Sequence, residues 1–247
     1  GGGMFVLFYL LFLIAMGVPV MTMEFAVGRA SRKSVIRSFT ELEKPGQKWH
    51  LHGYLGMAGN YLLMMFYTTV AGWMLYYFYQ MLTGGFTGKD KEQVADMFQG
   101  MLESPTVLTV VMVIIVVTGI LICSLGLQKG VERITKVMMI LLLFIIVVLA
   151  VRSMTLEGGI EGLRFYLMPD VARMQEVGIP ETITAAMNQA FFTLSLGIGS
   201  MAIFGSYIDK SRSLLGESVN IAILDTFVAL VSGLIIFPTC FAFDISP

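Results

Sequence analysis

Long runs of apolar residues, separated by shorter polar stretches, dominate the pattern of this 247-residue chain. Six of these runs approach the roughly 20 residues that a helix needs to cross the hydrocarbon core of a membrane. They cover about residues 4–27, 53–83, 106–126, 134–152, 182–207 and 216–242. Charged residues make up 13% of the chain, whereas a soluble domain carries about 25%. The sequence therefore predicts an all-α, polytopic membrane protein with six transmembrane helices.

Positive charges are distributed unevenly over the loops between these segments. Of the 16 Lys and Arg residues, all but five lie in loops 28–52, 127–136 and 208–215. The long loops 84–105 and 153–181 carry mainly carboxylates. Because cytoplasmic loops carry the excess of Lys and Arg, we expect both ends of the chain outside the cell and a location in the plasma membrane. A net charge of −1 gives no indication of a nucleic-acid partner.

Residues 188–200 place polar and small side chains inside the fifth apolar segment. They read NQAFFTLSLGIGS. Each Gly costs a helix about 1 kcal/mol relative to Ala, so this stretch is a weak helix. An opened helix within the membrane is stable only where its backbone lines a polar cavity, and there it can bind ions. Close packing of helices through small residues is the alternative that this pattern leaves open.

Asp225 is the second polar feature, and it is the only acid deep within one of the six segments. It lies roughly ten residues from the cytoplasmic end of its segment, which places it near the midplane at 1.5 Å per residue. A carboxylate at that depth costs about 2.5 kcal/mol or more, so such residues indicate function. Pairing with a Lys or Arg would be the structural explanation, but no basic residue lies at similar depth.

Several motifs in chain order resemble the neurotransmitter:sodium symporter family. Residues 191–199, FFTLSLGIG, resemble the broken sixth helix of that family, and residues 17–28, GVPVMTMEFAVG, are similar to the end of its second helix. Tyr67 and Trp73 have the spacing of aromatic residues in its third helix. Residues 126–136 resemble the internal loop before its fifth helix, and Asp225 precedes Gly233 by eight residues, where the family has a sodium-binding Asn.

The resemblance implies a fold of the bacterial leucine transporter type, in which inverted repeats alternate access to a site at the midplane. It implies that the chain is a single transmembrane fragment corresponding to helices two to seven of about twelve, truncated at both ends. Residues 1–152 would then belong to the first repeat, and residues 182–247 would begin the second.

The resemblance also implies roles for individual residues. Thr193 and Asp225 would contribute oxygens to a sodium ion, and Gln189 would support that site or act as a packing amide. The Tyr67 hydroxyl would donate to the carboxylate of an amino-acid substrate. The residues expected to line the substrate pocket are Leu63, Phe192, Ser195 and Ile198.

The expected function is sodium-coupled symport of a neutral, apolar or aromatic amino acid, since the pocket residues offer no charge to an ionic side chain. Chloride-dependent members place a Ser where this chain has Ala229, and Asp225 can supply the negative charge instead, so we expect independence of chloride. The expected partners are a small-molecule amino acid, sodium and the lipid bilayer; the sequence predicts no oligomeric state.

Two other functions compete with this one. A proton-coupled amino-acid transporter of another broken-helix family, acting through Asp225, is the main alternative. A membrane enzyme would need a second acid, a His or an activated nucleophile converging on Asp225. Both histidines, His50 and His52, lie beside a cytoplasmic loop, so we expect no enzyme activity.

Overall fold

The computed structural model describes residues 2–245, apart from the side chains of residues 127–129, and all regular structure in that part of the chain is helical. Gly1, which precedes the first predicted segment, and the Lys129 side chain, counted among the expected cytoplasmic charges, lie outside the described residues. The elements in chain order are α1 (Gly2–Phe12), η1 (Leu13–Gly17), α2 (Val18–Ser31), α3 (Val35–Leu42), α4 (His50–Leu82), α5 (Lys91–Leu102), α6 (Pro105–Ser124), η2 (Leu127–Glu132), α7 (Arg133–Met154), α8 (Gly159–Leu167), α9 (Val171–Val177), α10 (Ile179–Thr193), α11 (Ser200–Gly205) and α12 (Leu214–Ala242).

Among the described residues, four helices are long and apolar enough to cross a membrane. They are Gly2–Ser31, Pro105–Ser124, Gly130–Met154 and Leu214–Ala242. The chain is therefore a multi-pass membrane protein with these four candidate spans.

The other two expected spans, at 53–83 and 182–207, are not among these four helices, each for its own physical reason. The segment predicted at 53–83 lies in α4, a helix of 33 residues whose histidines, tyrosines, threonines and amides lower its mean hydropathy. The segment predicted at 182–207 is not one helix, because α10 has 15 residues, α11 has 6, and the backbone between them is not helical. The second case reflects the glycines and serines that the sequence places there.

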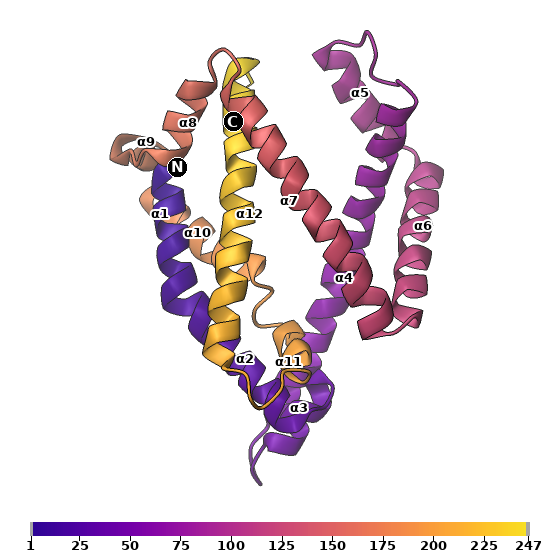
Figure 1. Ribbon diagram of the computed structural model, residues 1–247, viewed down its shortest axis with the longest axis vertical. Coiled ribbons are helices and arrows are strands. Elements are labelled where there is room, and N and C mark those ends of the chain that lie inside the picture. The colour runs from indigo at the N-terminus through magenta and orange to yellow at the C-terminus, as the bar shows by residue number, and fades with distance from the viewer. Residues whose placement is uncertain (1, 246–247) are drawn as a thin grey trace. The chain divides into compact units, whose positions relative to one another are not determined.

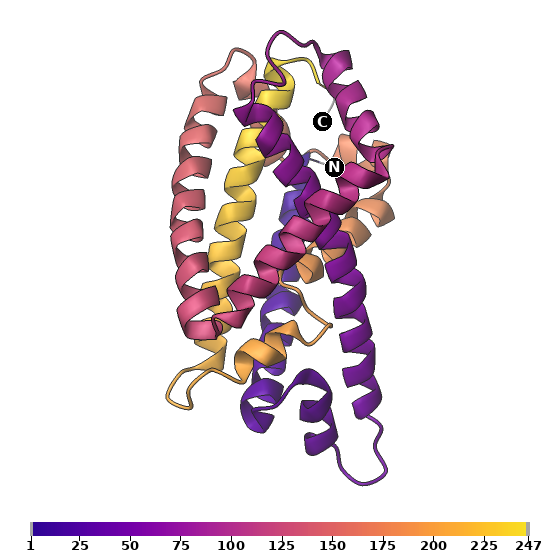
Figure 2. The same cartoon turned by 90° about the vertical axis from the view of Figure 1, so that its right-hand side faces the viewer.

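The chain forms two compact units. The first unit comprises the residues up to Ala58 and those from Ile140 onward, and the second comprises Gly59–Met139. In the first unit, α12 packs against α8 and α2, α1 packs against α10, and α2 packs against α11. Figure 1 shows the long α12 beside α8, and Figure 2 shows the non-helical backbone that joins α10 to α11.

The core of the first unit lies where α1, η1 and α2 meet α10 and its continuation. Its buried residues are Tyr9, Leu13, Met21, Phe25, Ala186, Ala190, Leu194, Leu196 and Ala222. The crossing of α2 and α11 depends on glycine, because a Cβ at Gly28 would lie 1.8 Å from the carbonyl oxygen of Ala202. Small residues of this kind let membrane helices approach closely where van der Waals contact drives their association.

A carboxylate organises the turn that leads into α4. Glu43 accepts hydrogen bonds from the backbone N–H of His50 at 3.0 Å, and its side chain contacts the His50 ring Nδ1 at 2.9 Å. The backbone hydrogen bond, followed by the side-chain one, lowers the pKa of Glu43 below its ordinary value. His50 is thus a structural residue at the start of the helix, as its position in the sequence suggests.

The second unit packs through aromatic residues of α4. Trp73 meets Phe98 of α5 edge-on with ring centroids 5.8 Å apart, and Tyr77 stacks on Phe86 at 5.5 Å. A capping box begins α5, since Asp90 accepts from the backbone of Gln93 and the Gln93 side chain accepts from the backbone of Asp90. Trp73 therefore acts in packing.

Candidate functional site

The helix formed by residues 179–205 is broken between Thr193 and Ser200. Three residues in the break have positive φ: Ser195 at 52°, Gly197 at 85° and Gly199 at 76°. Glycine adopts this left-handed region freely, whereas Ser195 does so at a cost of about 1–2 kcal/mol. The sequence leaves two possibilities for this stretch, an opened helix or close helix packing through small residues. The structure shows an opened helix.

Apolar anchors and one carboxylate hold the break in place. Leu194 and Leu196 are 3% and 8% exposed, and Leu194 packs against Gly17 in the π-helical turn η1. Glu24 of α2 accepts a hydrogen bond of 2.7 Å from the backbone N–H of Gly197. Since every backbone donor at membrane depth needs an acceptor, Glu24 replaces the helical carbonyl that Gly197 lacks. The sequence alone does not indicate this partner for Glu24.

Thr193 and Asp225 come together directly beside the break. The Thr193 hydroxyl donates a hydrogen bond of 2.8 Å to Oδ2 of Asp225, across 32 residues of sequence. Asp225 lies on α12, and none of the ion pairs among the described residues includes it. The carboxylate is therefore not neutralised by a Lys or Arg in the described part of the chain. Hard cations prefer hydroxyl and carboxylate oxygens of this kind.

Two further hydroxyl groups belong to the surroundings of this pair, and sequence reasoning missed both. Tyr9 of α1 lies close to Thr193, Asp225 and Thr226. Within residues 2–245, neither the Tyr9 hydroxyl nor the buried oxygen of Thr226 has a hydrogen-bond partner of good geometry. A phenol within an apolar segment is a weak signal, and nothing in the local sequence relates Tyr9 to a residue more than two hundred positions away. We refer to Tyr9, Thr193, Asp225 and Thr226 as the oxygen cluster.

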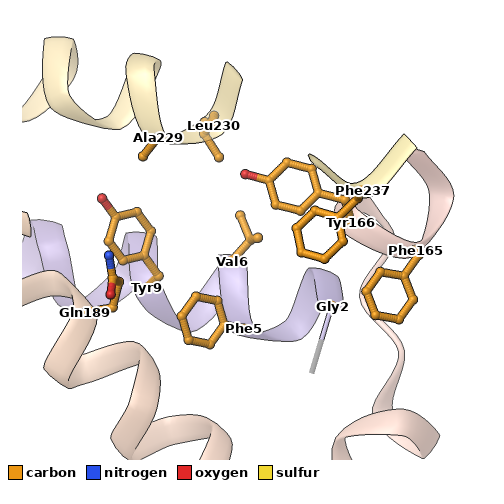
Figure 3. Close-up of a pocket in the computed structure, with 10 residues that line it drawn as sticks. All are labelled: Gly2, Phe5, Val6, Tyr9, Phe165, Tyr166, Gln189, Ala229, Leu230 and Phe237. Carbon is orange, nitrogen blue, oxygen red and sulfur yellow. The ribbon is translucent and has the colours of Figure 1, made fainter. Parts of the chain in front are cut away.

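A cavity of about 430 Å³ lies next to this cluster (Figure 3). Gln189, which lies one helical turn before Thr193 on α10, faces it beside Tyr9. The cavity is lined by Gly2, Phe5, Val6, Tyr9, Phe165, Tyr166, Gln189, Ala229, Leu230 and Phe237. The structure thus places Gln189 on the cavity wall rather than in a packed interior.

The residues expected to line the substrate pocket lie in both units. Phe192, which is 50% exposed, Ser195 and Ile198 are at the break in the first unit. Leu63 and Tyr67 lie four residues apart on α4 in the second unit, so they share one face of that helix.

Comparison with known proteins identifies relatives of this chain. The model of the "Sodium:neurotransmitter symporter family" matches residues 1–90 and 90–243. The uncharacterized sodium-dependent transporter YhdH of Bacillus subtilis (strain 168) is 34% identical over 247 residues, which is 100% of this chain and 54% of that protein. An uncharacterized sodium-dependent transporter of Haemophilus influenzae is 30% identical over 258 residues, covering 100% of this chain and 55% of that protein.

A more distant relative is named for its substrate class. The sodium-dependent neutral amino acid transporter B(0)AT2 of Mus musculus is 25% identical over 266 residues, which cover 96% of this chain and 36% of that transporter. The chain thus spans about half the length of the bacterial relatives and a smaller share of the mammalian one.

Proposed function

The chain belongs to the sodium:neurotransmitter symporter family, a family of sodium-dependent transporters and not of enzymes, and we propose that the full-length protein couples sodium to the uptake of a neutral amino acid. The observation that carries this proposal is the hydrogen bond between Thr193 and Asp225 beside the broken helix. This bond brings a hydroxyl and a carboxylate, which has no basic partner among the described residues, to the point where the helical backbone ends. The match to this family leaves the alternative, a proton-coupled carrier of another family, without support.

Sodium would bind at the oxygen cluster as a transported ion. Thr193 and Asp225 would supply a hydroxyl and a carboxylate oxygen, and the opened backbone can add carbonyl oxygens, which suits a hard monovalent cation. Bound sodium would compensate the charge of Asp225, which is expensive at membrane depth when it has no partner. Gln189 would support this site from the wall of the adjoining cavity.

Chloride would not be needed in this cycle. Another relative, the bovine sodium- and chloride-dependent taurine transporter, is 25% identical over 278 residues, so dependence on chloride occurs among proteins similar to this one. In this chain Ala229, one turn after Asp225, has no hydroxyl that could donate to an anion, whereas Asp225 itself would carry a fixed negative charge near the cation. That charge would take the place of the anion.

The substrate would be apolar or aromatic as well as neutral. Leu63, Phe192 and Ile198 would form the apolar pocket, the Tyr67 hydroxyl would donate to the substrate carboxylate, and the carbonyl near Ser195 would accept from its amine. None of these side chains carries a charge, so an ionic substrate side chain would be buried without a partner. The name of the mouse relative, a neutral amino acid transporter, supports the same class.

The proposed architecture is the inverted-repeat fold with six spans in this chain. Residues 1–152 would contribute four helices of the first repeat, and residues 182–247 would contribute two of the second, with the break in α10 and α11 at the midplane. The distribution of Lys and Arg over the loops supports insertion in the plasma membrane with both ends of this segment outside.

Uptake by the full-length protein in proteoliposomes tests the proposal. Labelled leucine or tyrosine should accumulate with an inward sodium gradient, not with an equal potassium gradient, and chloride replaced by gluconate should leave the rate unchanged. Unlabelled neutral apolar amino acids should compete most strongly. Uptake that does not depend on sodium would contradict the proposed coupling. Strongest competition by glutamate or lysine would contradict the proposed substrate class.

A further inference from the structure

The break between α10 and α11 packs against α3 and the beginning of α4, and Figure 1 shows α3 next to α11. Val35, the first residue of α3, is 2% exposed. A Cβ at Gly199 would lie 2.5 Å from Cγ1 of Val35 and 3.0 Å from its Cγ2. A Cβ at Gly56 of α4 would lie 3.0 Å from the carbonyl oxygen of Ile198. Two neighbouring residues of the break thus contact two different helices, all within the first unit.

Gly199 differs from Gly197 in this packing and not in its backbone conformation. Both have positive φ, 76° at Gly199 and 85° at Gly197. No described atom beyond the neighbouring residues lies within 4 Å of a Cβ at Gly197, whereas the two methyl groups of Val35 occupy the space that a side chain at Gly199 would need. Glycine is therefore required at position 199 for its conformation and also for its contact with Val35. The two glycines form a matched pair, in which one has this contact and the other lacks it.

α3 is held at both of its ends, so Val35 belongs to a fixed surface. On the side of α2, the Ser31 hydroxyl donates a hydrogen bond of 2.7 Å to the Ser38 hydroxyl, and the two residues are 7% and 0% exposed. On the side of α4, Glu43 accepts the hydrogen bond from the backbone of His50. Because breaking a buried hydrogen bond leaves its polar groups unsatisfied, moving α3 away from the break is costly.

This surface limits where the backbone of the break can lie. Ile198 is half-buried, and its backbone lies against Gly56 on one side while the next residue lies against Val35. Packed groups have few voids around them and transmit displacements to their neighbours. A smaller side chain at position 35 would let the backbone at Ile198 move toward α3, and a larger one would push it the other way.

We propose that Val35 is a positioning residue, which fixes Ile198 through Gly199 and thereby determines how large a substrate side chain the pocket accepts. The proposal rests on the proposed function, in which Ile198 lines the substrate pocket. Val35 itself touches neither the amino acid nor sodium in this arrangement. Its effect is therefore on the selectivity between large and small substrates rather than on transport as such.

The first test measures selectivity in Val35→Ala and Val35→Ile variants of the full-length protein in proteoliposomes. The readout is the ratio of the tyrosine and alanine concentrations that halve sodium-driven uptake of labelled leucine. Val35→Ala should lower this ratio, and Val35→Ile should raise it, each by about three- to tenfold, since one methylene in direct contact with a substrate is worth roughly tenfold or more. The control is Ile146→Val on α7, where the wild-type side chain is 7% exposed; it should lower the melting temperature in detergent and leave the ratio unchanged.

The second test moves a methyl group across the contact. Gly199→Ala places a Cβ against Val35 and should lower the melting temperature in detergent and the rate of leucine uptake. Adding Val35→Ala removes both methyl groups that this Cβ would meet and should recover part of each loss. Gly197→Ala has the same backbone strain without the contact, so Val35→Ala should recover neither loss there.

Three results would overturn the proposal. They are an unchanged tyrosine-to-alanine ratio in both Val35 variants, a shift of the ratio in the same direction in both, and equal effects of Val35→Ala on the Gly199→Ala and Gly197→Ala variants. Sodium-driven uptake by the unmutated protein is measured separately and tests the proposed function. The melting temperatures of the double variants test the contact without any transport, so the two failures are distinguishable.

Discussion

Replacing Asp225 by Asn removes one charge from the oxygen cluster and changes little else. The two side chains have nearly the same shape, and Asn keeps an oxygen that can accept the 2.8 Å hydrogen bond from Thr193. The resemblance places a sodium-binding Asn at this position in other members of the family. We therefore expect Asp225→Asn to fold and insert normally while it binds sodium more weakly.

The size of the effect follows from the interactions that lose their charge. A hydrogen bond to a charged group is worth about 1.5–3 kcal/mol, roughly twice a neutral one. Weakening the attraction between the ligand and the cation by a similar amount lowers sodium affinity about ten- to a hundredfold, since 1.4 kcal/mol corresponds to a factor of ten. The half-saturating sodium concentration for uptake should rise by that factor.

The assay is sodium-dependent uptake by the full-length protein in proteoliposomes, with chloride present or replaced by gluconate. Asp209→Asn provides the matched control, because it removes the same charge from an exposed position outside the helices. A second variant, Asp225→Asn with Ala229→Ser, introduces the hydroxyl that chloride-dependent members of the family have as a donor to the anion, and it should regain sodium affinity only when chloride is present. Transport that requires chloride in the unmutated protein, or an Asp225→Asn variant with unchanged sodium affinity, would refute this reasoning.

Three other changes test individual contacts. Tyr67→Phe should weaken apparent substrate affinity roughly tenfold at unchanged membrane yield, because a charge-assisted hydrogen bond worth about 1.5–3 kcal/mol is lost; equal affinity in competition assays would make Tyr67 a packing residue. Gly28→Ala should lower the melting temperature in detergent, since its Cβ would lie 1.8 Å from a carbonyl oxygen of α11 and overpacking costs about 1–3 kcal/mol, whereas Gly119→Ala, with open space around it, should be neutral. Glu24→Ala should reduce uptake and stability by leaving the Gly197 N–H without its acceptor, and Glu24→Gln, which keeps an oxygen, should lose less; equal losses would show that the hydrogen bond is unimportant.

The local features of this protein could be read from the sequence because each depends on neighbouring residues. Runs of about 20 apolar residues predict six spans, and four of these runs overlap helices that are long and apolar enough to cross a membrane among the described residues. The serines and glycines after Thr193 mark the break, because their helix propensity and their freedom at positive φ are properties of single residues. Asp225 is recognised as a candidate functional residue because a carboxylate within an apolar segment costs free energy to bury in the membrane.

Contacts between distant segments were decided only by the tertiary structure. The sequence contains an unpaired acid and a hydroxyl, and only the packing of α10 against α1 and of α12 beside them brings Tyr9 to both. The sequence alone does not show that Glu24 accepts a hydrogen bond from the backbone of Gly197, because every residue except Pro has the same backbone donor. The cavity has the same origin: its walls come from four elements spread over the chain, and an empty volume arises from how surfaces fit together, for which no local pattern of residues is a signal.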